Sequence, residues 1–328
     1  MFNVPESKEI EIRTYTEIIK GGGVVAFPTE TVYGLGASAW NPDAIAKVFE
    51  LKGRPSDNPL IVHIANYGML INLAAEIPQN SRILMQKFWP GPLTLIFEKR
   101  PQVLDVITGG LNSVAVRMPD HAFALKLIQL TGPLVAPSAN KSGKPSPTKA
   151  EHVAADFGKT VPVLDGGACV IGLESTVLDV RTEPFKILRP GRITAKMIFE
   201  RTGIEVIETS ANSDQQNNDK PDSPGMKYKH YSPNARVRWM TNEEIKGDLS
   251  TDKVLYLAQN EFKLDEESQG KLVVFHGDLD RMASELYDWF RASDIDGFSE
   301  IAIQAFDLKK ESDIRVALSN RISKAITD

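Results

Sequence analysis

Two cations separated by one glycine, Lys52 and Arg54, stand directly before a short apolar run in the segment KGRPSDNPLIVHI, residues 52–64. An arginine can hold a phosphate with its planar fork, and a lysine adds a point charge. Gly53 permits a tight bend and two prolines stiffen the loop, so both cations can lie on one side at little entropic cost. The segment predicts a site for a small anion such as a phosphate, with a solvated surface loop as the alternative.

Two polar side chains fall within or at the end of apolar runs. His63 lies between Val62 and Ile64, where a histidine is either a hydrogen-bonded core residue or a ligand-binding group. Arg117 ends the run SVAVR, and a buried cation needs an internal carboxylate or a ligand anion as its partner. Both residues are candidates for a binding site.

Two loops gather hydrogen-bonding side chains just after apolar strands. PTETVYGLG, residues 28–36, places Thr29, Glu30 and Thr31 before two glycines, and PSANKSGKPSPT, residues 137–148, is rich in serine and proline. Ligands of α/β proteins bind at such strand ends, although a capped turn and a surface loop are the alternatives. Weaker polar candidates in ESTVLD and LRPGRI are Ser175, Thr176, Arg189 and Arg192.

Familiar nucleotide-binding and catalytic motifs are missing from the sequence. It contains neither G-x-x-x-x-G-K-[ST] nor G-x-G-x-x-G, so any phosphates must be held by side chains and loop amides. No G-x-S-x-G or Cys–His arrangement proposes a covalent nucleophile. The single cysteine, Cys169, excludes a disulfide framework, and the five histidines lack the paired spacing of a zinc site. We therefore assign no metal-ligating residue.

The polar loops are connected by alternating strands and helices. Short runs rich in β-branched residues predict strands at 24–28, 60–64, 93–97, 114–117, 134–138, 175–180 and 185–188. Asn41 is expected to cap a helix with Pro42 at its first position, and later caps are expected at Asp120, Thr148 and Thr194. This alternation predicts an α/β domain with a mixed sheet.

The chain changes character after residue 208. Residues 209–223 are polar and aperiodic, as in a linker, and the following PGMKYKHYSP combines aromatic side chains, cations and prolines, which favours a docking segment. The last hundred residues again alternate strands and helices, which predicts a small three-layer α/β domain. We predict three parts: a catalytic domain at 1–208, a linker or lid at 209–234, and an accessory domain at 235–328.

Charge and hydropathy limit the classes of partner. No apolar run is long enough to span a membrane, and the N-terminus lacks the pattern of a signal peptide, so we expect a soluble, cytoplasmic protein. The net charge is −5, but residues 51–150 contain eleven Lys and Arg against five Asp and Glu. A local basic excess in an acidic protein favours a small anionic ligand over a long nucleic acid.

The motifs PTETVYGLG, KGRPSDNPLIVHI, SVAVRMP, PSANKSGKPSPT, ESTVLD and LRPG, in this order, resemble the YrdC-like family. The added SPGMKYKHYSP and second α/β region are similar to the two-domain form of that family. The resemblance implies a twisted mixed-sheet domain followed by a smaller Rossmann-like α/β domain. It also implies synthesis of threonylcarbamoyl-AMP from L-threonine, bicarbonate and ATP with release of pyrophosphate, the first step of threonylcarbamoyladenosine formation beside the tRNA anticodon.

The resemblance assigns ligand roles to residues of the quoted motifs. L-Threonine would be held by Thr31, His63, Arg117, Ser138 and Ser175. ATP would be held by Lys52, Arg54, Asn58, Ser113, Asn140, Thr148, Arg189 and Tyr231. Lys52 and Arg54 would stabilise developing charge, with Mg²⁺ bound to the ATP phosphates. Tyr228, His230 and Tyr231 would form a lid that excludes water.

Two interpretations are distinguished by their partners. As a synthase, the protein would pass its product to a tRNA threonylcarbamoyl transferase, and its own contact with tRNA would be weak or indirect. The alternative is a non-catalytic RNA-binding module that uses the basic region 51–150. The acidic C-terminal third and the missing aromatic-basic RNA motif weigh against this alternative.

Overall fold

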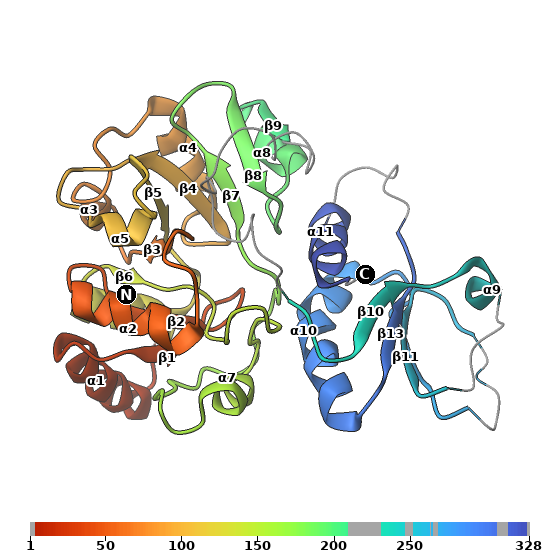
Figure 1. The fold of residues 1–328 in the computed structure, drawn as a ribbon. Helices are drawn as coiled ribbons and strands as arrows, with labels where there is room; N and C mark the ends of the chain where they lie inside the picture. Colours follow the sequence, from red (N-terminus) through yellow and green to blue (C-terminus); the bar gives the residue numbers. More distant parts are fainter. Residues whose placement is uncertain are drawn as a thin grey trace.

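The computed structural model describes residues 4–208, 231–246, 252–262, 264, 268–306 and 314–326. Two α/β units lie side by side, the larger one ending with β9 and the smaller one beginning with β10 (Figure 1). The prediction of a mixed-sheet α/β domain followed by a smaller α/β domain is confirmed.

The N-terminal domain is built on a nine-stranded sheet with the order β1-β2-β6-β3-β5-β4-β7-β8-β9. The pairs β3/β5, β4/β7 and β8/β9 are parallel and the other neighbours are antiparallel. The strands are β1 (Val25–Phe27), β2 (Gly34–Ser38), β3 (Ile61–His63), β4 (Leu93–Glu98), β5 (Ser113–Arg117), β6 (Leu134–Val135), β7 (Thr176–Asp179), β8 (Phe185–Arg189) and β9 (Val206–Glu208).

Strand register brings polar residues from distant segments to one end of this sheet. β3 and β5 run parallel with His63 opposite Arg117, so both strands deliver a polar side chain at the same level. β4 places Thr94 opposite Arg117 from the other side. Ser175 directly precedes β7, whose first residue pairs with Leu93 next to Thr94. Strand pairing thus assembles the site that the separate motifs only suggest.

Helices cover the sheet and begin at recognisable caps. Asn41 accepts hydrogen bonds from two backbone amides at the start of α2, Pro42 occupies its first position, and Gly53 ends it with φ of 60°. This left-handed glycine turns the chain toward Arg54. The helices are α1 (Glu6–Lys20), α2 (Pro42–Lys52), α3 (Tyr67–Leu70), α4 (Gln79–Phe88), α5 (Asp105–Thr108), α6 (Ala122–Thr131), α7 (Ala150–Phe157) and α8 (Ala195–Thr202).

Several local predictions require correction. Thr194 caps α8 as expected, but α6 is capped by His121 instead of Asp120, and α7 begins after Lys149, one residue beyond Thr148. The strand expected at 134–138 ends at Val135 because the chain leaves the sheet to form the following loop. β2 was missed because its two glycines have low strand propensity.

The C-terminal domain has a four-stranded, fully parallel sheet with the order β10-β13-β11-β12. The two longest helices, α10 and α11, pack on one face of this sheet, whereas the apolar residues of the opposite face form a separate small cluster. The short helix α9 lies on that opposite face, where its Glu244 pairs with Arg238 of β10 at 2.7 Å (Figure 1). The elements of this domain are β10 (Arg236–Trp239), α9 (Asn242–Ile245), β11 (Val254–Ala258), β12 (Lys271–Val274), α10 (Leu279–Asp296), β13 (Glu300–Ile303) and α11 (Arg315–Ala325).

α10 and α11 lie between the C-terminal sheet and the N-terminal domain (Figure 1). Arg291 of α10 forms a buried ion pair with Asp156 of α7 at 2.8 Å. Gly172 approaches α10 so closely that an added Cβ atom would lie 2.4 Å from the Cα atom of Ser284. These contacts hold α10 against the N-terminal domain.

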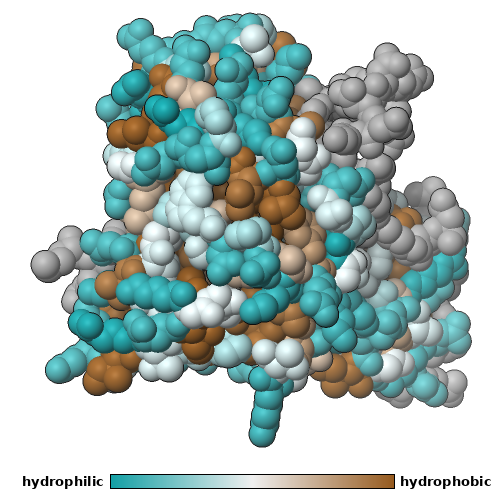
Figure 2. Space-filling model, turned by 60° about the vertical axis from the view of Figure 1, so that its left-hand side comes forward, coloured by the Kyte–Doolittle hydropathy of each residue, from teal (hydrophilic) through white to brown (hydrophobic). Residues whose placement is uncertain are grey.

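The surface shown in Figure 2 is mainly hydrophilic, with exposed apolar side chains in small groups. The large exposed apolar residues of the N-terminal domain come from separate elements, such as Ile10 of α1 and Ile71 after α3. None of the described helices combines the length and hydrophobicity that crossing a bilayer requires.

Candidate active site

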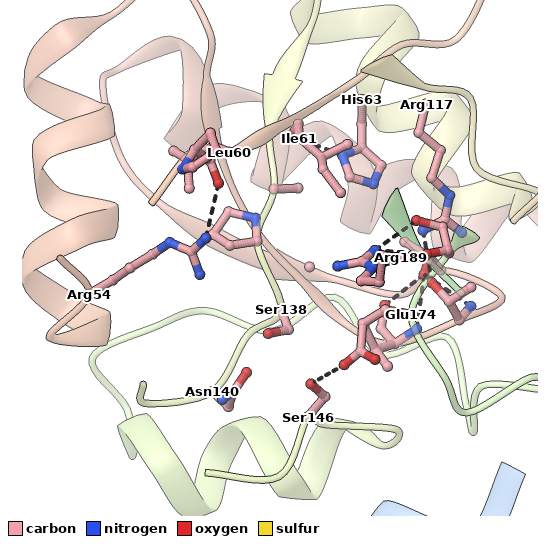
Figure 3. Close-up of a pocket in the computed structure, with 18 of the residues that line it drawn as sticks. Arg54, Leu60, Ile61, His63, Arg117, Ser138, Asn140, Ser146, Glu174 and Arg189 are labelled. Atoms are coloured by element: carbon pink, nitrogen blue, oxygen red, sulfur yellow. Dashed lines mark hydrogen bonds between the residues drawn. The ribbon is translucent and has the colours of Figure 1, made fainter. Parts of the chain in front are cut away.

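A pocket opens at the end of the sheet where β3 and β5 deliver His63 and Arg117 (Figure 3). Its cavity measures about 70 Å³, well below the roughly 300–1,000 Å³ of typical drug-sized ligand sites. Nine of the predicted site residues line it: Thr31, Arg54, His63, Arg117, Ser138, Asn140, Ser175, Arg189 and Tyr231.

Arg117 is held from three directions although it is almost fully buried. Its Nε donates to the carbonyl of Gly91 at 3.2 Å, and its Nη1 donates to the Thr31 hydroxyl at 2.9 Å. Its Nη2 lies 2.7 Å from Glu30 in a buried ion pair whose angles are not those of a hydrogen bond. Because a guanidinium has five N–H donors, this fixed cation can still receive a ligand carboxylate.

The hydroxyl of Thr31 has a defined orientation. Thr29 donates its one hydroxyl proton to the carbonyl of Val32 at 2.6 Å, so the 2.9 Å contact between the two threonine hydroxyls must be donated by Thr31. Thr31 accepts in turn from Arg117. The remaining acceptor capacity of Thr31 therefore belongs to the pocket, where it suits an amine or a hydroxyl donor.

His63 is a buried neutral imidazole. Burial, reinforced by the nearby charge of Arg117, lowers the pKa of His63 to about 3. Its ring meets Phe27 edge to face and its Nδ1 lies 3.4 Å from the carbonyl of Ile61. At neutral pH, His63 can exchange hydrogen bonds with a ligand but cannot supply a positive charge.

Arg189 lies on the wall of the pocket beside Ser175. Its Nε and Nη2 donate to the carbonyl of Ser175 at 3.1 and 2.9 Å, and Nη2 also reaches the Ser175 hydroxyl at 3.1 Å. That hydroxyl is 2.7 Å from the hydroxyl of Thr94. The end of β8 thus places a buried, rigid cation next to a polar loop.

Arg54 enters the pocket from the side opposite to Arg117 and Arg189 (Figure 3). Its guanidinium donates to the side-chain oxygen of Asn58 at 2.6 Å and to the carbonyl of Pro59 at 2.9 Å. Asn58 does not line the pocket, so its observed contact is with Arg54. Asn58 orients the cation that the sequence predicted to meet phosphate.

The side chain of Lys52 does not line the pocket, although its position in the sequence suggested that it would. Its ammonium group is buried and donates to the carbonyls of Ser138 and Asn140 at 2.5 and 2.6 Å. Burial lowers the pKa of Lys52 well below its usual value. Lys52 does not line the pocket and instead ties the end of α2 to the serine-rich loop.

Two other predicted ATP ligands lie away from the pocket lining. Ser113 is the first residue of β5 and Arg117 is the last, so about 13 Å of strand separates them. Thr148 lies at the start of the α7 segment, where its backbone amide donates to His152 and its carbonyl accepts from Cys169. Their predicted contacts with ATP remain predictions that this pocket does not support.

Sequence reasoning missed the carboxylate of Glu174, which lines the pocket next to Ser175. Glu174 accepts hydrogen bonds from Ser146 at 2.6 Å, from Tyr287 at 3.1 Å and from Arg321 at 2.7 Å. Tyr287 and Arg321 belong to the C-terminal domain, so no local pattern could have identified them. A glutamate inside the apolar stretch before β7 was the available signal.

Tyr231 closes one side of the pocket. It is 4% exposed, has φ of 69° and stacks on Tyr287 with ring centroids 5.3 Å apart. The next residue, Ser232, donates its amide to Gly143 of the serine-rich loop. Tyr228 and His230, the other predicted lid residues, lie outside the described residues.

The amide oxygen of Asn140 is a buried acceptor without a hydrogen-bond partner among the described residues. Its amide nitrogen donates to the carbonyls of Lys141 and Lys144, so the orientation of the group is set by the loop. A buried acceptor on a pocket wall is suited to a ligand hydroxyl or amine.

Comparison with known proteins identifies the family. A family model described as "Telomere recombination" matches residues 17–191, and one described as "Threonylcarbamoyl-AMP synthase, C-terminal domain" matches residues 193–326. The threonylcarbamoyl-AMP synthase of Pyrococcus abyssi is 43% identical over 99% of this chain and 97% of its own length. This chain belongs to the threonylcarbamoyl-AMP synthase family.

Two further matches cover nearly the whole chain. The threonylcarbamoyl-AMP synthase of Bacillus subtilis is 42% identical over 96% of this chain and 92% of its own length. A structure of P. abyssi Sua5 complexed with L-threonine has a TM-score of 0.85 at 40% identity and covers 97% of this chain and 94% of that one. The family resemblance and the prediction of an enzyme of nucleotidyltransferase type are confirmed, and the residue-level ligand roles stay predictions.

Proposed function

We propose that this chain synthesises threonylcarbamoyl-AMP from L-threonine, bicarbonate and ATP, with release of pyrophosphate. The product would then pass in the cytoplasm to a separate transferase, which modifies the tRNA adenosine beside the anticodon. Support comes from the family and from one observation: a single pocket joins Arg117, held beside a neutral histidine, to the separate cations Arg54 and Arg189. Such a pocket suits an amino acid and a polyphosphate together.

The amino acid fits the part of the pocket around Arg117. Its carboxylate would meet the guanidinium of Arg117, which Gly91, Thr31 and Glu30 hold in place. Its amine would donate to the oriented hydroxyl of Thr31, and neutral His63 would hydrogen-bond the side-chain hydroxyl. Ser138 and Ser175 remain the other proposed contacts, since both line this pocket.

The nucleotide fits the part between Arg54 and Arg189. The amine of threonine and bicarbonate first give a carbamate and water, and a carbamate oxygen then attacks the α-phosphorus. The bond to the bridging oxygen of the β-phosphate breaks, and pyrophosphate leaves with that electron pair. Arg54 and Arg189 would stabilise the charge on the departing group, and the acceptor oxygen of Asn140 would receive a ribose or adenine donor.

Lys52 would act by positioning instead of touching phosphate. Its two hydrogen bonds hold the backbone of Ser138 and Asn140 in the conformation that presents both side chains to the pocket. This role replaces the direct charge stabilisation expected from the motif. No side chain needs to serve as a general base, since positioning and charge stabilisation supply the catalysis.

Magnesium would reach this pocket with ATP. The described residues in and beside the pocket do not fit a protein-made Mg²⁺ site. Glu174 on the pocket wall is paired with Arg321, and Glu30, which does not line the pocket, is paired with Arg117. Phosphate oxygens and water are the usual ligands of Mg²⁺ in nucleotide sites. No step is assigned to the ion.

Tyr231 would be the described part of the proposed lid. Tyr231 lines the cavity of about 70 Å³, so its movement would enlarge the space for the nucleotide and its return would cover the bound ligand. Exclusion of water would protect both the carbamate and the mixed anhydride from hydrolysis. We expect Tyr231→Ala to lower the ratio of threonylcarbamoyl-AMP formed to pyrophosphate released, and an unchanged ratio would contradict the lid.

The decisive test is pyrophosphate release from ATP with L-threonine and bicarbonate each supplied or withheld. We expect product formation to require both, with the mass of threonylcarbamoyl-AMP in the nucleotide fraction. A folded protein that gives no such product with Mg²⁺ present would refute the proposal. RNA titrations at several salt concentrations would then test the alternative binding module, whose affinity should fall steeply with salt.

A further inference from the structure

Glu174 connects the pocket to the C-terminal domain through Arg321. The two side chains are 147 residues apart in sequence, and Nε of Arg321 donates to the carboxylate of Glu174 at 2.7 Å. Arg321 is 0% exposed and also donates to the carbonyl of Pro190 at 3.0 Å. A guanidinium from α11 is therefore buried directly behind the pocket wall.

The carboxylate of Glu174 is charged because of its partners. Burial by itself would raise the pKa of Glu174, but Arg321 and then Arg189 outweigh this effect and, with the Ser146 hydroxyl, lower the pKa to about 2. Arg321 supplies the ion pair, whereas the hydrogen bonds of Arg189 to described residues go to Ser175. Arg321 and Arg189 both act on the carboxylate of Glu174, and the nearer of the two, Arg321, comes from the C-terminal domain.

This arrangement sets the electrostatics of the nucleotide site. A lone buried carboxylate beside Arg189 would cancel the positive charge that an anionic ligand needs, since interactions between charges are strong at low dielectric. We propose that Arg321 is a positioning residue that engages Glu174, so that the charge of Arg189 acts on the phosphates of the ligand. This role rests on the proposed function, and it explains why a catalytic pocket includes contacts from the C-terminal domain.

The same side chain also meets the residue that closes the pocket. The guanidinium of Arg321 lies 5.6 Å from the ring centroid of Tyr231, and Tyr287, which donates to Glu174, stacks on the same ring. A purely structural role for Arg321 would act through this packing. The experiment must therefore separate the charge of Arg321 from its volume.

A charge cycle on Glu174 and Arg321 makes that separation. The probe is inorganic pyrophosphate, and its affinity is measured by calorimetry for the wild type, Arg321→Gln, Glu174→Gln, the double variant and Arg321→Lys. We expect Arg321→Gln to weaken binding about tenfold, because Glu174 is left uncompensated beside Arg189. Glu174→Gln should tighten binding about threefold, because a buried negative charge is removed.

The double variant carries the decisive outcome. Because it restores the charge balance, its pyrophosphate affinity should return to within about threefold of the wild type. Arg321→Lys should lie between the wild type and Arg321→Gln, since a lysine restores the charge but cannot reproduce both hydrogen bonds. A double variant that binds as weakly as Arg321→Gln would overturn the proposal in favour of packing.

Arg291→Gln is the matched control, because Arg291 forms the other buried ion pair between the domains, with Asp156 at 2.8 Å. It should lose thermal stability but keep wild-type pyrophosphate affinity. If Arg321→Gln does not fold, Glu174→Gln still tests the idea, since weaker binding by that variant would contradict it. Equal losses of affinity in Arg291→Gln and Arg321→Gln would also contradict it.

Failure of this inference can be told apart from failure of the proposed function. If the wild type makes threonylcarbamoyl-AMP and the charge cycle shows no rescue, the synthase function stands and the role of Arg321 falls. If the wild type binds pyrophosphate and shows the rescue but makes no product, the role stands and the synthase function falls. A folded wild type that binds no pyrophosphate overturns the role of Arg321 whatever its activity.

Discussion

At the scale of single residues, burial decides which polar groups carry charge in the pocket. His63 is neutral because its pKa is lowered to about 3, whereas Glu174 is charged because two arginines outweigh its burial. Lys52 is buried and its ammonium group donates to two backbone carbonyls. The pocket thus places fixed charges on arginines, whose pKa is high enough to keep them charged.

His63 should make the protein less stable in mild acid. Its folded-state pKa lies below the unfolded value of 6.5, so the unfolded chain binds more protons below pH 6.5 and stability falls as pH falls through that value. We expect His63 to account for a loss of about 1 kcal/mol between pH 7 and pH 5.5. Urea unfolding at pH 7 and pH 5.5 would measure this loss of stability, and the His63→Asn variant should not show the part that is due to His63. An equal loss in both proteins would contradict the neutral buried imidazole.

Replacement of Lys52 by methionine should release the serine-rich loop. Two hydrogen bonds to the carbonyls of Ser138 and Asn140 are lost, and we expect a loss of roughly 2 kcal/mol in stability with a higher KM for ATP. Lys47→Met is the control, since Lys47 on the same helix donates to the carbonyl of Gly22, far from the pocket. An unchanged KM in Lys52→Met, with activity intact, would rule out the positioning role.

At the scale of elements, β2 must lie close to β1, and its glycines make this possible. A Cβ atom at Gly36 would lie 2.6 Å from the ring of Phe27, which also meets the imidazole of His63 edge to face. A Cβ atom at Gly34 would meet the same ring at 3.4 Å. The spacing of two strands is therefore linked, through one aromatic ring, to a predicted ligand of threonine.

Gly36→Ala should disturb the threonine part of the pocket more than Gly34→Ala. The Phe27 ring that must shift also contacts the imidazole of His63, and overpacking of this kind costs about 1–3 kcal/mol. We expect a lower melting temperature and a higher KM for threonine, with a smaller change in the KM for ATP. Comparable KM values for threonine in Gly36→Ala and the wild type would show that Phe27 does not position His63.

At the scale of the whole molecule, the docking of the two domains completes the pocket. Glu174 lies in the N-terminal domain, and its partners Tyr287 and Arg321 lie in the C-terminal domain. Gly172, two residues before Glu174, lies close against the backbone of α10. A change at Gly172 that moves α10 away should therefore reach Glu174, which lies two residues further along the chain.

Gly172→Ala tests this coupling. Gly172 has φ of 74°, and its new Cβ atom would lie 2.5 Å from the carbonyl oxygen of Ala283, so the domains must shift apart. Gly167→Ala is the control, since Gly167 has φ of 83° with open space around its Cβ position and should lose only about 1–2 kcal/mol from strain. We expect Gly172→Ala alone to increase the radius of gyration in X-ray scattering and to weaken pyrophosphate binding. Identical scattering and binding for the two variants would refute the coupling.

Much of the site could be predicted from the sequence because its residues follow short-range rules. Arg117 ends an apolar run, and Thr31 and Ser138 closely follow one. Ser175 directly precedes the run of β7, and the ends of strands are where ligand loops form. Asn41 and Thr194 cap helices through contacts with amides two or three residues away. Helix caps and strand ends are determined by a few neighbouring residues, so they can be predicted without knowledge of the fold.

Long-range pairing determined what the sequence could not. The glycines of β2 form a strand through pairing with β1 and β6. Lys52 turns inward and donates hydrogen bonds to two distant carbonyls. Ser113 belongs to the same apolar run as Arg117, but the length of β5 carries the two apart. The pairing of Glu174 with Arg321 depends on the docking of two domains, and no local pattern encodes a contact between residues 147 positions apart.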